Sequence, residues 1–95
     1  MEVIEWIQNW YHNNCDGDWE HMYGMKIYNV DNPGWAVEIE LIDTKFEDKV
    51  FEKVQYDNGD EDWLLCFVKD GIFQGNGDSR KLKKILDIFR DWVEE

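Results

Sequence analysis

The chain has 95 residues, 43% hydrophobic and 16% aromatic, a length that fits one compact domain and leaves no room for a second. Its formal net charge of −12, from 22 acidic and 10 basic residues, opposes binding to nucleic acid phosphates and to anionic membranes. The imbalance is strongest in residues 1–44, which carry nine acids and one base, and it fits either a solvated acidic surface or a basic protein partner.

The start of the chain, Met1–Glu5, contains no basic leader. The longest uninterrupted apolar run, Trp63–Val68, is far shorter than the roughly 20 residues of a membrane-spanning helix. We therefore expect a soluble, cytoplasmic protein. In that compartment we expect the two cysteines, Cys15 and Cys66, to remain reduced thiols rather than form a disulfide.

The first predicted element is an amphipathic helix from about Glu2 to Asn14. Its apolar residues fall on one broad arc at the 3.6-residue period of a helix, with polar residues opposite. These apolar residues are Val3, Ile4, Trp6, Ile7, Trp10 and Tyr11. We expect this aromatic face to pack in the core. The segment Cys15–Asp18 ends the helix, because Gly17 supplies the left-handed geometry common at helix ends.

From about His21 to Gly75 the hydrophobic period changes to two, which predicts β-strands. The alternation is clearest at Trp35–Leu41, where Glu38 and Glu40 lie between apolar residues. This strand should therefore have one face in contact with solvent.

Turn residues divide this region into about five antiparallel strands in a meander. The turn signals are Asp31–Gly34, Asn58–Gly59 and Asp70–Gly71. The strand Trp63–Val68 is apolar on both faces, so we expect it to be central in the sheet or covered on both sides.

The last predicted element is a second amphipathic helix, from about Ser79 to Glu94, with Asp78 or Ser79 as its N-cap. Its apolar positions are Leu82, Ile85, Leu86, Phe89, Trp92 and Val93. The first turns are basic (Arg80, Lys81, Lys83 and Lys84), although a helix dipole favours acids there. Ordinary surface charge, pairing with acids of the sheet and a second contact surface are three explanations. The predicted fold is α+β, with both helices flanking the sheet in sequence and the last one packed on it.

The densest polar constellation is the run Cys15–His21, which has three interpretations. Catalysis by Cys15 with His21 is disfavoured, because the neighbouring carboxylates oppose formation of a thiolate. A metal site is disfavoured, because the run has no CxxC pair, no HExxH motif and no calcium-loop spacing. The third interpretation is recognition, since carboxylates on both sides of Trp19 suit a Lys- or Arg-rich surface. Trp19 could equally belong to the core, with the acids facing solvent.

Two other motifs are weaker. The acidic run Asp57–Asp62 differs from a calcium loop because Val68, at the twelfth position, has no carboxylate, and a hairpin tip explains it better. Gly75–Ser79 is superficially similar to a phosphate loop but is not followed by Gly-Lys-Ser/Thr, so we reject nucleotide binding. We expect no cofactor and no metal.

Several segments together resemble the signature of the immunity 53 family. They are Trp10-Tyr11, Cys15–His21, Tyr23-Gly24 and Asp31–Trp35, followed more loosely by Asp62-Trp63, Gly71, Phe73, Gly75 and the C-terminal helix. The resemblance covers nearly the whole chain and is most specific at Cys15–His21. It implies an α+β immunity protein of a bacterial polymorphic toxin system, which neutralises a toxin encoded beside it by direct binding and without enzymatic activity. The basic start of the last helix departs from the acidic one we would expect there.

The residues and the resemblance together predict an antitoxin whose partner is a basic toxin domain. If that toxin is a nuclease, an acidic surface would block its basic cleft as a phosphate mimic. The candidate toxin-binding residues are Asp16, Asp18, Trp19, Glu20, Asp31, Glu38 and Glu40. Two alternatives stay open: an acidic adaptor that recognises another basic protein, and a small enzyme based on Cys15 and His21 or on a metal. The oligomeric state stays open as well.

Overall fold

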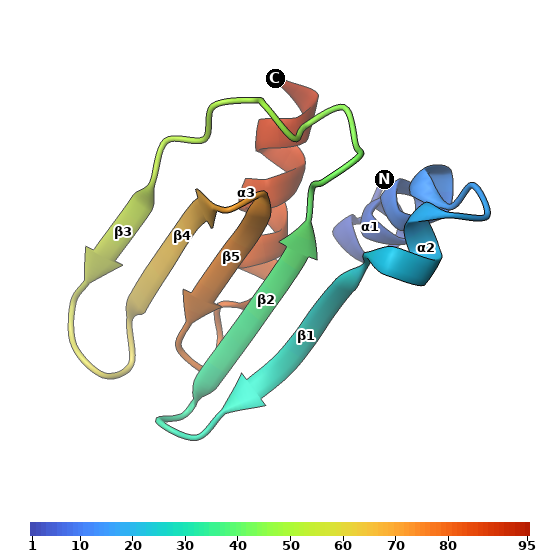
Figure 1. The fold of residues 1–95 in the computed structure, drawn as a ribbon. Coiled ribbons are helices and arrows are strands. Elements are labelled where there is room, and N and C mark those ends of the chain that lie inside the picture. The colour runs from blue at the N-terminus through green and yellow to red at the C-terminus, as the bar shows by residue number, and fades with distance from the viewer.

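The computed structural model describes residues 1–95 and contains one five-stranded antiparallel sheet with two long helices behind it (Figure 1). The helices are α1 (Val3–Asn14), the single turn α2 (Trp19–Met22) and α3 (Leu82–Glu94). The strands are β1 (Met25–Val30), β2 (Gly34–Glu40), β3 (Val54–Asp57), β4 (Trp63–Lys69) and β5 (Ile72–Gly77). The predicted α+β class, with an N-terminal helix, five antiparallel strands and a C-terminal helix on the sheet, is confirmed.

The strand order is β1-β2-β5-β4-β3, which departs from a simple meander at one place. The hairpin β1-β2 and the meander β3-β4-β5 follow the predicted turns, but β2 pairs with β5 rather than with β3. Residues 41–53 carry the chain from the end of β2 to β3 at the far edge of the sheet (Figure 1). This order places β2 and β5, which hold the fully buried Ile39 and Phe73, side by side under α3.

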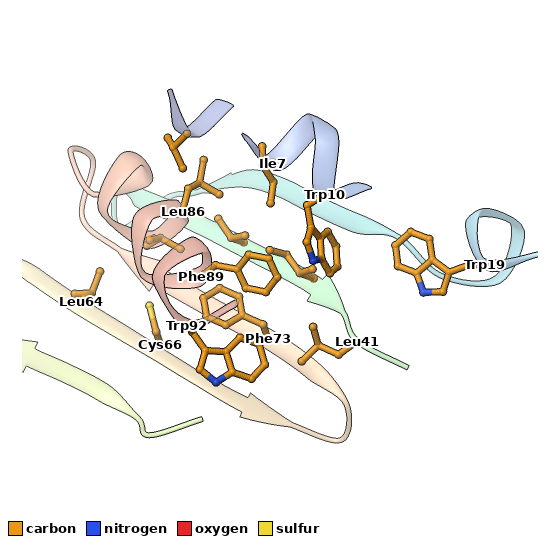
Figure 2. Packing of buried hydrophobic residues seen from close by; sticks show 14 residues of the cluster. Ile7, Trp10, Trp19, Leu41, Leu64, Cys66, Phe73, Leu86, Phe89 and Trp92 are labelled. Carbon is orange, nitrogen blue, oxygen red and sulfur yellow. The ribbon is translucent and has the colours of Figure 1, made fainter. Parts of the chain in front are cut away.

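The core lies between one face of the sheet and the helices (Figure 2). Alternate residues of the inner strands face this layer. Five of them are at most 1% exposed: Val37, Ile39, Leu64, Cys66 and Phe73. Helix α1 adds Val3, Ile7 and Trp10, and α3 adds Ile85, Leu86, Phe89 and Trp92. A Cβ at Gly75 would overlap the Ile85 side chain, so the absence of a side chain at this position lets α3 approach the sheet.

The apolar arc predicted for α1 is broader than the stripe that is buried. Ile4 is 46% exposed and Tyr11 38% exposed, although both were expected in the core. The reason is position: β1 is the edge strand of the sheet, so no further strand lies beyond it to receive these side chains. The three residues that are buried, Val3, Ile7 and Trp10, follow the helical spacing.

The last helix begins at Leu82, three residues later than predicted, because Asp78 closes a turn before it. The Asp78 carboxylate is nearly buried and accepts hydrogen bonds from the backbone N–H of Arg80 (2.9 Å) and of Trp63 (3.0 Å). Lys81 Nζ lies 2.7 Å from this carboxylate and 2.9 Å from that of Asp62. Pairing with acids therefore explains Lys81, and Lys83 pairs with Asp87 one turn along the helix.

Candidate functional site

One face of the sheet is not covered by any helix, and we call it the open face (Figure 1). Strand β4 alternates between the two faces: Leu64 and Cys66 are buried in the core, whereas Leu65 and Phe67 point to the open face. The prediction that β4 lies inside the sheet is correct, but covering on both sides is wrong. The chain has only two long helices, and both lie on the same side of the sheet, so no helix is left to cover its other face.

The open face carries apolar side chains from four strands. They are Tyr28 and Val30 of β1, Ala36 of β2, Trp63, Leu65 and Phe67 of β4, and Ile72 of β5. Tyr28 is 43% exposed, and all the others except Ala36 are half-buried. None of these residues belongs to the buried core cluster or to the half-buried side chains packed against it. The apolar part of the open face therefore does not stabilise the two-layer core.

Trp63 is the only one of the six tryptophans on the open face. A Cβ at Gly34 would overlap the carbonyl oxygen of Gly77 and would lie 3.2 Å from Val30 Cγ2 and 3.3 Å from Trp63 Cζ2. The missing side chain at Gly34 thus lets the β5 backbone approach β2 closely and leaves room for the Trp63 ring beside it. The backbone N–H of Trp63 donates to Asp78, which fixes the start of β4 and with it this corner of the open face.

Glu38 and Glu40 lie on the open face, as the alternation predicts, and both are half-buried. The Tyr28 hydroxyl donates to Glu38 (2.7 Å), and this bond raises the pKa of Tyr28. Lys26 and Lys69 share the face, so its centre carries little net charge.

Uncompensated acids gather instead at the hairpin end of the sheet, where the β1-β2 and β3-β4 turns lie side by side. A groove between these turns is lined by Asn32, Pro33, Asp60, Glu61, Ser79 and Arg80. Asp31, Asp57, Asp60 and Glu61 are exposed and form no ion pair. Arg80 is the one cation lining the groove. We call these four acids the acidic rim.

The run Cys15–His21 forms a tight turn between α1 and α2 whose carboxylates are largely used within it. Asp16 Oδ1 accepts from the backbone N–H of Asp18 (2.9 Å) and of Trp19 (3.0 Å). Glu20 accepts from the N–H of Asp16 (2.9 Å) and of Gly17 (2.8 Å). Hydrogen bonds from the amides of Trp19 and Asp18 lower the pKa of Asp16. Asp16 and Glu20 therefore hold the turn, whereas Asp18 is exposed and makes no side-chain hydrogen bond or ion pair.

Trp19 lies in the core and is 4% exposed. Its indole N–H donates to the carbonyl of Ile42 (3.0 Å), and its ring makes edge contacts with Trp10 and Tyr11. A partner cannot contact this ring without opening the fold. Trp19 was considered both as a contact for a partner and as a core residue, and its burial shows that it is a core residue.

The two cysteines have different environments. Cys15 Sγ donates to the carbonyl of Tyr11 (3.3 Å), and no hydrogen bond joins Cys15 to His21. Cys66 is fully buried, and burial raises the pKa of its thiol to about 12. No three His, Cys, Asp or Glu side chains are grouped so that they could hold a metal ion.

A comparison with protein families matches residues 4–94 to the family described as Immunity protein 53. The chain belongs to this immunity protein family. Membership confirms the resemblance found in the sequence and supports an immunity role, which implies binding to a cognate toxin. No curated protein and no solved structure matches the chain. None of its helices combines the length and apolarity needed to span a bilayer.

The candidate toxin-binding residues of this immunity protein do not form one cluster. Glu40 donates its N–H to the carbonyl of Gly24, just after α2, so Glu38 and Glu40 are near the end of the sheet that carries the Asp16–Glu20 turn. Asp31 lies at the opposite end of β2, a span of seven residues or about 20 Å. The predicted acids therefore lie in two groups at opposite ends of the sheet, and the two groups do not contact each other.

Sequence reasoning overlooked the surface position of Trp63, Leu65 and Phe67 and the acids beside Asp31. The signal is the apolar pattern on both faces of Trp63–Val68, which predicts a strand that is central in the sheet or covered on both sides and does not distinguish these from a strand with one open apolar face. The acids of Asp57–Asp62 were assigned to a hairpin tip, which is correct, without a role in contact.

Proposed function

We propose that this chain is an antitoxin that acts in the cytoplasm by direct binding, covering the working surface of a cognate toxin and performing no chemistry itself. The observation that carries the proposal is the match to the immunity protein 53 family over residues 4–94. The net charge of −12 adds a physical reason for a basic partner, because opposite charge accelerates encounter.

A nuclease is the toxin class that suits this charge best, because its substrate cleft must be basic to hold phosphates. Carboxylates that occupy such a cleft would take the place of the phosphates. Asp18, Glu38 and Glu40 are the carboxylates near the α2 end of the sheet that we propose for contact, with Asp31 at the far end. Asp16, Glu20 and Trp19 would act by fixing the turn that presents Asp18.

The test is rescue from toxicity. The toxin domain encoded beside this gene is expressed alone and together with this chain, and growth and co-purification are recorded. We expect growth to be restored and a stable complex to be isolated. Toxicity without rescue, or a neighbouring gene that encodes no toxin, would contradict the proposal and favour an adaptor for another basic protein.

The nuclease proposal has its own measurement. The toxin released from the complex is assayed on DNA and RNA with and without this chain added back. Cleavage that the chain suppresses in proportion to complex formation would support phosphate mimicry. A toxin that cleaves neither substrate would exclude it while leaving direct binding intact.

A further inference from the structure

The open face departs from the usual chemistry of a solvated sheet surface. An antiparallel sheet with one covered face normally alternates apolar residues inside with polar residues outside. Here β4 presents Trp63, Leu65 and Phe67 on the outer side, and β5 presents Ile72. Clustered apolar side chains on a surface, bounded by polar ones, are typical of sites that bind another macromolecule.

The strand register places these side chains in rows across the sheet, with polar side chains of β5 and β2 between them. Leu65 pairs with Asn76, which pairs with Ala36, and Ala36 pairs with Tyr28. In the next row, Phe67 pairs with Gln74, which pairs with Glu38. Protein interfaces combine aromatic and apolar anchors with polar groups, and this face does so, with Trp63 and Phe67 on β4 and Tyr28 on β1.

The acidic rim identifies the chemistry of the partner. Trp63 pairs with Asp57 in the β3-β4 hairpin, whose turn carries Asp60 and Glu61. Asp31 precedes Asn32 and Pro33, which line the same groove from the β1-β2 turn. Exposed carboxylates without ion pairs attract a basic surface. A second copy of this chain is disfavoured as the partner, because two chains that each carry a net charge of −12 repel one another.

We propose that the open face, centred on Trp63, Leu65 and Phe67, is the docking surface for the toxin domain. The partner would present an exposed apolar patch bordered by Lys and Arg residues that meet the acidic rim. The inference rests on the proposed function and adds the surface that performs it.

The central test changes the apolar part of the face. Phe67→Lys keeps the strand but places a charge where the partner would exclude water. We expect the affinity for the neighbouring toxin domain to fall by about 100-fold, mainly through faster dissociation. Leu65→Lys is a second variant with the same purpose, and circular dichroism establishes that each is folded. A folded variant that binds as tightly as the unmodified chain would overturn the proposal.

The rim is tested by a charge-matched pair of double variants. Asp60→Lys with Glu61→Lys should slow association about tenfold at low salt and leave dissociation nearly unchanged. Asp48→Lys with Glu52→Lys makes the same charge change in the connection between β2 and β3, at the other end of the sheet, and should have a much smaller effect (Figure 1). Equal slowing by both pairs would show that net charge alone acts and would overturn the role of the rim.

Hydroxyl-radical footprinting of the unmodified complex needs no substitution. Trp63 and Phe67 should be protected when the toxin domain is bound, whereas Tyr11, exposed on α1, should stay reactive. Protection of Tyr11 with Trp63 unchanged would place the contact elsewhere and overturn the inference. A toxin domain that forms no complex with the unmodified chain would contradict the proposed function itself, so the two failures are distinguishable. A dimer of the free chain that Phe67→Lys dissociates, with toxin binding retained, would assign the face to self-association instead.

Discussion

Strand β4 presents apolar side chains to both faces of the sheet, but the two faces have different surroundings. On the covered face, Leu64, Cys66 and Phe73 are at most 1% exposed and pack against α1 and α3. On the open face, Leu65 and Phe67 belong to the same strand as Leu64, yet they remain half-buried with no helix above them. The difference indicates that one face of the sheet stabilises the fold and the other is available to a partner.

The first prediction compares a phenylalanine from each face. Phe89 is fully buried and makes aromatic contacts with Trp6, Trp10, Phe73 and Trp92, so Phe89→Ala should lower the free energy of unfolding by about 3 to 5 kcal/mol. Phe67→Ala should cost about 1 kcal/mol or less, because it leaves no cavity in the core. Urea denaturation followed by circular dichroism measures both.

Binding should show the opposite order. Phe67→Ala should weaken the complex with the toxin domain strongly, whereas any Phe89→Ala protein that remains folded should bind normally. If Phe67→Ala destabilised the fold as much as Phe89→Ala does, the open face would be part of the core, and the distinction between the faces would be lost.

The second prediction concerns Asp78, which joins the start of β4 to the turn that precedes α3. Hydrogen bonds from Lys81 and from the backbone lower the pKa of Asp78 from its ordinary value of 3.8 to about 2. As the pH falls, the unfolded chain is therefore protonated at this residue before the folded one. The stabilisation from Asp78 should be complete above about pH 4 and lost as the pH falls toward 2.

Asp78→Asn isolates this contribution from those of the other carboxylates. The unmodified chain should be more stable than the variant at pH 7, and the difference between them should shrink between about pH 4 and pH 2. Thermal unfolding at a series of pH values measures it. A difference that stays constant over this range would show that the charge of Asp78 does not hold the turn.

The third prediction compares two glycines with and without space for a side chain. Gly75→Ala should lower the free energy of unfolding by about 1 to 3 kcal/mol, because its Cβ would displace Ile85 and lift α3 from the sheet. A Cβ at Gly24 would have no neighbouring atom within 4 Å, so Gly24→Ala should be neutral or slightly stabilising. Chemical denaturation of the two variants gives the comparison, and equal stabilities would contradict the close approach of α3.

Local patterns were enough to predict the elements of this fold. The 3.6-residue period of Val3–Asn14 and the two-residue period of Trp35–Leu41 both report which side chains meet the core. The pairing of β2 with β5 was not predictable in this way, because it joins residues more than 30 positions apart and depends on which strands pack best under α3. The start of α3 was displaced for a similar reason, since Asp78 bonds to Trp63 of a distant strand.

The candidate site was predictable in its charge but not in its position. The alternation around Glu38 and Glu40 placed these acids on an exposed face correctly. The same reasoning could not show that Trp63, Leu65 and Phe67 lie on that face, because the number of helices covering a sheet is a property of the whole chain. Hydrogen bonding inside the Asp16–Glu20 turn was equally hidden, since it depends on the backbone path of five residues.

The smallest expected effect separates two acidic turns that look alike in the sequence. Asp16 accepts two backbone hydrogen bonds within its turn, so Asp16→Ala should lower the temperature of unfolding by a few degrees. Asp60 accepts none, so Asp60→Ala should leave that temperature unchanged and should only slow association with the toxin domain. Differential scanning calorimetry and binding kinetics measure the two effects. Should Asp16→Ala instead leave stability intact and reduce toxin binding, the turn between α1 and α2 would belong to the contact surface, and the division between a structural turn and a binding turn would be wrong.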